Sequence, residues 1–130
     1  MMRIVQTDNA PQAIGPYSQA MKVGDFIFTS GQIALTPSGV MVQDSIELQT
    51  EQVMKNLQAV LEAAGSCLKN VVKTTIFLAD MDDFTTVNAI YEKWFDGHKP
   101  ARSTVAVKTL PKNALVEIEC IALVEATIPG

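Results

Sequence analysis

Hydrophobic and polar residues alternate in two short runs near the start of the chain, at residues 17–23 and 26–33. Only a glycine and an aspartate separate the runs, and a two-residue loop with glycine first suits a type II′ hairpin turn. The register that this turn imposes sets Tyr17 opposite Gln32 and puts Tyr17 and Ser30 on the same face. The pattern therefore predicts an antiparallel hairpin with Tyr17 and Ser30 on a common surface.

The periodicity becomes helical from residue 44 onward. Apolar residues repeat at helical spacing, namely Val53, Leu57, Val60, Leu61 and Ala64. Asp44 and Glu47 resemble a capping box at one end, and Gly65 suits the position just after the other end. The pattern predicts a long amphipathic helix over residues 45–64.

A strand and a second helix follow. Residues 71–78 are rich in β-branched side chains and predict a strand. Asp82 or Asp83 can cap the helix after it, and Gly97 can end that helix. Its apolar side would carry Phe84, Val87, Tyr91 and Trp94.

Two more β-prone runs complete the pattern, at residues 103–107 and 115–124, with a turn-like connection at residues 110–113. The element order is then ββαβαββ. This order is typical of the α+β class, with both helices on one face of a mixed sheet. A length of 130 residues fits one domain, so we expect a single domain over residues 1–130.

The last predicted strand has two different faces. Alternate residues from 116 to 124 are apolar and should meet the helices. The other face carries Leu115, Glu117, Glu119, Ile121 and Leu123. A solvated sheet face should be polar throughout, so these apolar residues favour a homo-oligomer in which another subunit covers the face. The alternative is a monomer in which the loop at residues 36–43 folds over it.

Composition excludes several classes of function. The net charge of −4 has the wrong sign for unspecific binding to nucleic acid or anionic lipid. His98, Cys67 and Cys120 do not stand at zinc-ligand spacing, so we expect no metal site. We interpret both cysteines as buried thiols in a reducing compartment, and His98 as a surface or helix-end residue. The start of the chain lacks the apolar core of a secretory signal, and no run suits a membrane helix, so a cytoplasmic location is the default expectation.

The candidate chemistry rests on one arginine and two glutamates. Arg102 opens a β-prone run, from which its guanidinium could bind the carboxylate of a small acid in bidentate fashion. From spacing alone, a structural ion pair with Glu117 or Glu119 is the favoured interpretation of Arg102. The two glutamates would lie about 7 Å apart on one strand face, where repulsion and partial burial raise a carboxyl pKa toward the range of acid–base catalysis. Without other information, such carboxylates are more often solvated or ion-paired.

Five runs along the chain resemble the RidA family, also called the YjgF-type family. They are IGPYSQA at residues 14–20, TSGQI at 29–33, NLQAVLEAAG at 56–65, PARS at 100–103 and VEIECIA at 116–122. The resemblance runs in order over nearly the whole chain.

The resemblance implies a chorismate-mutase-like α+β fold, assembled as a homotrimer with active sites in clefts between subunits. It also implies a hydrolytic deaminase without metal or organic cofactor. Such an enzyme converts reactive enamine or imine intermediates, 2-iminobutanoate and 2-iminopropanoate, to 2-oxo acids and ammonia. A small-molecule imine or 2-oxo acid is the expected ligand.

The resemblance also assigns roles to residues. Arg102 would hold the substrate carboxylate, and Glu119 would orient and activate the attacking water. The positions that line the family's pocket match Tyr17, Ser30 and Asn88. Thr104 stands where many members have cysteine and would contribute chiefly through its backbone amide.

Two other functions remain as alternatives. The first is a regulatory or chaperone-like module that binds a 2-oxo acid without turnover; it needs Arg102 but not Glu119. The second is the ribonuclease or translation-inhibitor activity attributed to some relatives of this family. The acidic charge balance, the single histidine and the lack of a basic stripe with aromatic residues argue against that activity.

Overall fold

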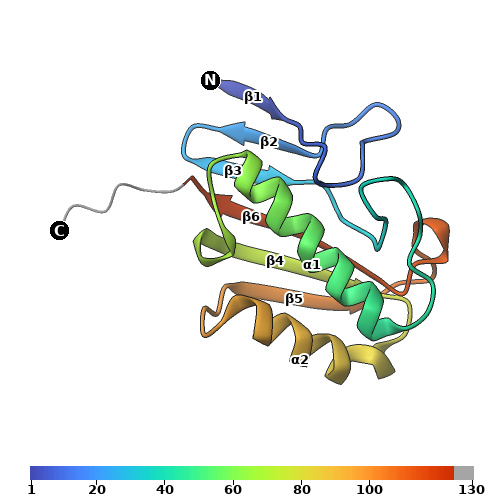
Figure 1. The fold of residues 1–130 in the computed structure, drawn as a ribbon. Coiled ribbons are helices and arrows are strands. Elements are labelled where there is room, and N and C mark those ends of the chain that lie inside the picture. Colours follow the sequence, from blue (N-terminus) through green and yellow to red (C-terminus); the bar gives the residue numbers. More distant parts are fainter. Residues whose placement is uncertain (125–130) are drawn as a thin grey trace.

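The computed structural model describes residues 1–124, in which one mixed sheet is covered on one face by two α-helices (Figure 1). The strands are β1 Met2–Val5, β2 Ala20–Val23, β3 Phe26–Thr29, β4 Val71–Leu78, β5 Ala101–Ala106 and β6 Val116–Leu123. The helices are α1 Ile46–Ala63 and α2 Phe84–Phe95, with short 3₁₀ turns η1 Leu68–Asn70, η2 Met81–Asp83 and η3 Pro111–Asn113. The strand order is β1-β2-β3-β6-β4-β5, and only β4 and β5 pair in parallel within these residues. The predicted α+β class is confirmed.

The hairpin of β2 and β3 has the predicted turn and register at its tip. Val23 pairs with Phe26, and Gly24 has the positive φ of +58° that a type II′ turn requires. Both strands are shorter than predicted, and Tyr17 does not pair with Gln32. Instead Gln32 exchanges backbone hydrogen bonds of 2.9 and 3.1 Å with Ile118 of β6. Ser30 still donates its N–H to the Gln19 carbonyl at 2.9 Å, as the predicted register requires, and only after Ser30 does the chain leave β2 and follow β6.

Strand β1 is absent from the predicted order. It pairs antiparallel with β2 at one edge of the sheet, and its first three residues are exposed. This four-residue edge strand buries only its last residue and shows no strong hydrophobic alternation. Its pairing therefore depends on the hairpin of β2 and β3 beside it.

Helix α1 matches the predicted element but begins with a different cap. The Ser45 hydroxyl, not the Asp44 carboxylate, accepts the Leu48 backbone N–H at 3.1 Å. Gly65 follows the helix with a φ of +80°, as predicted.

The start of α2 also differs in detail. Asp83 at the N-cap position has helical backbone angles and makes no capping hydrogen bond through its side chain. The Asp80 carboxylate instead accepts the backbone N–H of Asp82 at 2.9 Å and caps the preceding 3₁₀ turn. Because this turn runs directly into α2, the cap lies one turn earlier than predicted.

Strand β6 has the two faces that the alternation predicts. Val116, Ile118, Cys120 and Ala122 are buried in the core with α1 and α2, and the intervening residues are half-buried. In the loop at residues 36–43, Met41 and Val42 pack against that same core.

The loop therefore does not cover the outer face of the sheet. Phe26 and Phe28, which pair with Leu123 and Ile121 of β6, remain 45 % and 44 % exposed. The monomeric alternative, in which loop 36–43 covers this face, is wrong for these residues. No helix within residues 1–124 combines the length and the apolar character needed to span a bilayer.

Candidate active site

Arg102 and Glu119 lie on opposite faces of the sheet in one chain. Arg102 of β5 pairs with Thr74 of β4, and Thr74 pairs with Cys120 of β6. Because paired residues in neighbouring strands point to the same face of a sheet, all three side chains point to the helix-covered face. Glu119 pairs with Thr75 and points to the outer face. An ion pair between Arg102 and either glutamate of β6 within one chain is therefore excluded, against the expectation from spacing.

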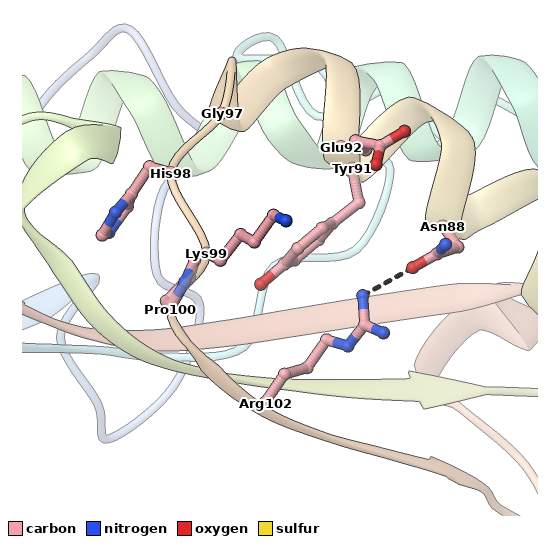
Figure 2. A pocket seen from close by; sticks show the side chains of 8 residues that line it. All are labelled: Asn88, Tyr91, Glu92, Gly97, His98, Lys99, Pro100 and Arg102. Atoms are coloured by element: carbon pink, nitrogen blue, oxygen red, sulfur yellow. Dashed lines mark hydrogen bonds between the residues drawn. The ribbon is translucent and has the colours of Figure 1, made fainter.

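The guanidinium of Arg102 is held by residues of helix α2. Its Nη1 donates a hydrogen bond of 2.6 Å to Asn88 Oδ1. Its Cζ lies 5.0 Å from the ring centre of Tyr91 and 5.4 Å from that of Phe84, within the range of cation–π contacts. Figure 2 shows the guanidinium beside the Tyr91 ring and directed at Asn88. Asn88 accepts one of the five N–H donors of the Arg102 guanidinium, so other donors remain for a carboxylate.

Arg102, Asn88 and Tyr91 border a hollow of about 420 Å³ between α2 and the start of β5, which we call the Arg102 hollow. Its lining consists of Asn88, Tyr91, Glu92, Gly97, His98, Lys99, Pro100 and Arg102. His98 donates from Nε2 to the Val71 carbonyl at 2.7 Å, since a carbonyl only accepts. Its backbone N–H bonds to Phe95 just after α2, so the helix-end interpretation is confirmed, and the side chain also borders the hollow.

The hydroxyl of Tyr91 is tied to the sheet. It shares a hydrogen bond of 2.7 Å with Thr74 Oγ1 of β4 in the buried interior. Burial raises the pKa of Tyr91, and the Thr74 hydrogen bond and the Arg102 charge oppose that rise. Tyr91 is therefore a neutral, fixed surface against which the arginine lies.

A second hollow, of about 550 Å³, lies near the outer face, and we call it the Tyr17 hollow. Among its lining residues are Tyr17, Ser30, Gly31, Gln32, Lys112 and Glu117. The predicted common surface of Tyr17 and Ser30 is thus confirmed. Ser30 donates its hydroxyl proton to the Ser18 carbonyl at 2.5 Å, so its oxygen can act only as an acceptor in a further hydrogen bond.

Gln19 fixes the chain beside the Tyr17 hollow. Its buried amide accepts the Thr7 N–H at 2.7 Å and donates to the Pro11 carbonyl at 2.7 Å. The loop at residues 7–11 is thereby held beside Gln19, and Pro11 and Gln19 line the hollow together with Tyr17.

Glu117 and Glu119 follow each other on the outer face, and both are half-buried. Burial, and then the charge of Glu119, raise the pKa of Glu117, as the sequence predicts for at least one of the pair. The Glu117 carboxyl group packs against Gly31, where a Cβ would lie only 2.8 Å from Glu117 Cδ. The absence of a side chain at Gly31 therefore leaves room for the Glu117 carboxyl group.

Thr104 lies two residues after Arg102 in β5 and points to the same face. Its Oγ1 is buried and has no hydrogen-bond partner among residues 1–124. A buried, unsatisfied hydroxyl costs stability and is available to a bound molecule.

The cysteines differ from each other. Cys120 is buried, and burial raises the pKa of its thiol to about 12, although a hydrogen bond from Thr29 opposes the rise. Cys67 is half-buried, not buried as predicted. No three His, Cys, Asp or Glu side chains of the described residues lie together as a metal-ligand group.

The structure thus divides the candidate residues of the sequence between two places. Arg102 and Asn88 belong to one hollow, whereas Tyr17 and Ser30 belong to the other. Sequence reasoning did not find Phe84 and Tyr91 as neighbours of Arg102, although their spacing with Asn88 on one helix face was visible. One side of the sheet can bind an anion, and the other carries carboxyl groups that can exchange protons.

Comparisons with known proteins agree over most of the chain. The family described as Endoribonuclease L-PSP matches residues 7–124. A 2-iminobutanoate/2-iminopropanoate deaminase of Salmonella typhimurium is 45 % identical over 126 residues, which are 95 % of this chain and 98 % of that protein. A RutC family protein of Pyrococcus horikoshii is 49 % identical over 126 residues, 96 % of this chain and all of that protein.

A solved structure, that of E. coli TdcF with bound serine, matches with a TM-score of 0.89 and 40 % identity, covering 95 % of this chain and 99 % of that chain. The relatives carry different names: some are named RutC family proteins, others 2-iminobutanoate/2-iminopropanoate deaminase, and one of Arabidopsis thaliana Reactive Intermediate Deaminase A. On the family match and these identities, the chain belongs to the Endoribonuclease L-PSP family, which includes the YjgF and RidA proteins.

Proposed function

We propose that this chain, as a single domain over residues 1–130, is a hydrolytic deaminase of reactive enamines and imines that needs no cofactor. Its substrates are 2-iminobutanoate and 2-iminopropanoate, and its products are 2-oxo acids and ammonia. The active site forms between subunits of a homotrimer, where the Arg102 hollow of one subunit meets the Tyr17 hollow of the next.

The position of Arg102 and Glu119 on opposite faces of one sheet carries this proposal. Neither group can reach the other across a packed sheet, so one chain alone does not hold a carboxylate and activate water beside it. Two copies of the chain can bring Arg102 and Glu119 together, because a heterologous interface joins different surfaces of the same chain. The exposed Phe26 and Phe28 on the outer face support such a contact.

In this reaction the enzyme positions the substrate and transfers protons. Arg102 binds the carboxylate of the protonated 2-imino acid through two N–H···O bonds and so places the imine carbon. Glu119 of the partner subunit accepts a proton from water as the water oxygen bonds to that carbon. The same carboxyl group then returns the proton to nitrogen.

The C–N bond breaks as the hydroxyl proton of the adduct passes to Glu119 and then to the released ammonia. The products are therefore the 2-oxo acid and ammonium, with the carboxylate restored. Tyr17, Ser30, Asn88 and Thr104 line the bound substrate in this scheme. Serine, the ligand in the TdcF structure, also carries nitrogen on the carbon next to a carboxylate, which supports this class of ligand.

The test generates 2-iminobutanoate in situ with an amino-acid oxidase and follows competition between the protein and semicarbazide as a chemical trap. We expect the wild type to divert imine from the trap and Arg102→Ala and Glu119→Ala to lose this effect. Arg3→Ala and Glu62→Ala, which change exposed residues outside both hollows, serve as matched controls. No diversion by the wild type, with 2-oxo acid binding that still depends on Arg102, would overturn the deaminase and support the binding module.

A further inference from the structure

Helix α2 presents three residues to Arg102 at positions i, i+4 and i+7. They are Phe84, Asn88 and Tyr91, which therefore lie on one side of the helix. We propose that Phe84 and Tyr91 are positioning residues that hold the Arg102 guanidinium between their rings, with Asn88 fixing its orientation. The inference rests on the proposed function for what Arg102 binds, but the clamp itself is a property of the chain.

The Tyr91 side of this clamp is rigid. Its ring is buried, its hydroxyl is bonded to Thr74 of β4, and the ring of Phe95 packs behind it at 4.5 Å between centres. Strand β4 is also the neighbour of β5, which carries Arg102. The ring and the arginine are thus positioned by the same pair of strands.

The Phe84 side lies at the first residue of α2, next to the capped 3₁₀ turn. Phe84 is half-buried against the core, and Arg102 itself lies exposed on the edge strand β5. An exposed arginine samples many rotamers, and freezing it on ligand binding costs affinity. Rings on α2 that already confine the guanidinium remove most of that cost before the ligand arrives.

The clamp predicts a change in ligand affinity and not in proton transfer. In Phe84→Leu, the dissociation constant for pyruvate and the KM for imine should rise about two- to tenfold, because the ligand must then order the side chain. The value of kcat should stay within about twofold, since Glu119 is untouched. Phe84→Tyr retains a ring and should behave like the wild type. Tyr91→Phe retains the ring but loses the Thr74 hydrogen bond, so it should show a smaller rise than Phe84→Leu.

The clamp can be observed directly, without any turnover. Arg3 and Arg102 are the only arginines in the sequence, so the Nε–Hε signal of Arg102 in a heteronuclear NMR spectrum is assigned by its loss in Arg102→Lys. Stacking against two rings should shift this proton upfield of the exposed Arg3 signal and slow its motion. Both effects should weaken in Phe84→Leu and return in Phe84→Tyr.

The two readouts separate this inference from the proposed function. An Arg102 signal that is identical to that of Arg3, or unchanged in Phe84→Leu, overturns the clamp even if the chain hydrolyses imines. A shifted signal that depends on Phe84, with a raised dissociation constant for pyruvate in Phe84→Leu, supports the clamp even if the imine assay shows no turnover. A fall in kcat and in thermal stability of Phe84→Leu with an unchanged pyruvate affinity overturns it, because that pattern indicates only a structural role.

Discussion

The two faces of the sheet differ in how many contacts one chain supplies to the candidate residues on them. On the helix-covered face, Arg102 is supported by a hydrogen bond and two aromatic rings from α2 of the same chain. On the outer face, Glu117 and Glu119 lie half-buried, and the apolar side chains of Phe26 and Phe28 stay exposed among residues 1–124. In the proposed function, the anion-binding Arg102 is thus prepared within one copy, whereas Glu119, the proposed proton-transfer group, depends on a second copy to complete its surroundings. We infer that assembly, more than local folding, controls the chemistry.

The largest effect should come from the outer face. Glu119→Gln keeps the shape but removes the base, so we expect kcat to fall about 10²- to 10⁴-fold. Affinity for pyruvate should change little, because the Arg102 hollow is untouched. Single-turnover rates and pyruvate titration measure the two quantities separately. If Glu119→Gln lost pyruvate affinity by as large a factor as it lost kcat, the two faces would not have the separate roles proposed for them.

The helix-covered face should respond in affinity. Arg102→Lys keeps the charge but loses the bidentate fork, and we expect the dissociation constant for pyruvate to rise about 10- to 100-fold. Calorimetric titration measures it, with Arg3→Lys as the matched control. A lysine variant that binds pyruvate as well as the wild type would contradict a specific clamp on the carboxylate.

The contact between Gly31 and Glu117 gives a smaller, local test. A methyl group at residue 31 would overlap the Glu117 carboxyl group, which can swing aside, so Gly31→Ala should destabilise the fold by about 1 kcal/mol. The backbone of Gly31 is not in the left-handed region, so space and not strain is tested. In a Glu117→Ala background the same substitution should cost almost nothing. Denaturant titration of the four proteins gives the coupling, and additive effects would exclude this contact.

The smallest expected effect concerns the charge of Glu117. Because burial and Glu119 raise its pKa in the folded chain, the folded state holds the proton more tightly than the unfolded state. Stability should therefore fall as the pH rises through the folded pKa of Glu117, and Glu117→Gln should escape this loss. With solvent screening of a half-exposed group, we expect the melting temperature of Glu117→Gln to exceed that of the wild type by about 1–3 °C at pH 7. The difference should vanish below pH 4, and a constant difference at both pH values would contradict this cause.

Strong local signals made much of the fold predictable. The strand β4 and the body of α1 follow from β-branched residues and from a long apolar repeat, and β6 shows its two faces by alternation. The edge strand β1 has no comparable signal, because its pairing depends on the hairpin beside it. The N-terminal caps were wrong by one to three residues, since several Ser and Asp side chains compete at each helix start.

The candidate residues could be named from the sequence, but their positions relative to one another could not. Arg102, Tyr17 and Ser30 lie in the short runs that resemble the family, and Asn88 was named only as what the resemblance implies. That Arg102 and Glu119 face opposite ways depends on the pairing of β5 with β4 and of β4 with β6, which are contacts between distant parts of the chain. For the same reason, Phe84 and Tyr91 could be assigned to the apolar side of a helix but not to the arginine.

Mixing two inactive variants tests the shared site most directly. Arg102→Ala and Glu119→Ala proteins are each expected to be inactive, and their subunits are allowed to exchange, with native mass spectrometry to verify mixed trimers. If each site takes Arg102 from one subunit and Glu119 from the next, about a quarter of the sites in an equal mixture regain both groups, and imine hydrolysis returns. Mixed trimers that remain inactive would contradict the account.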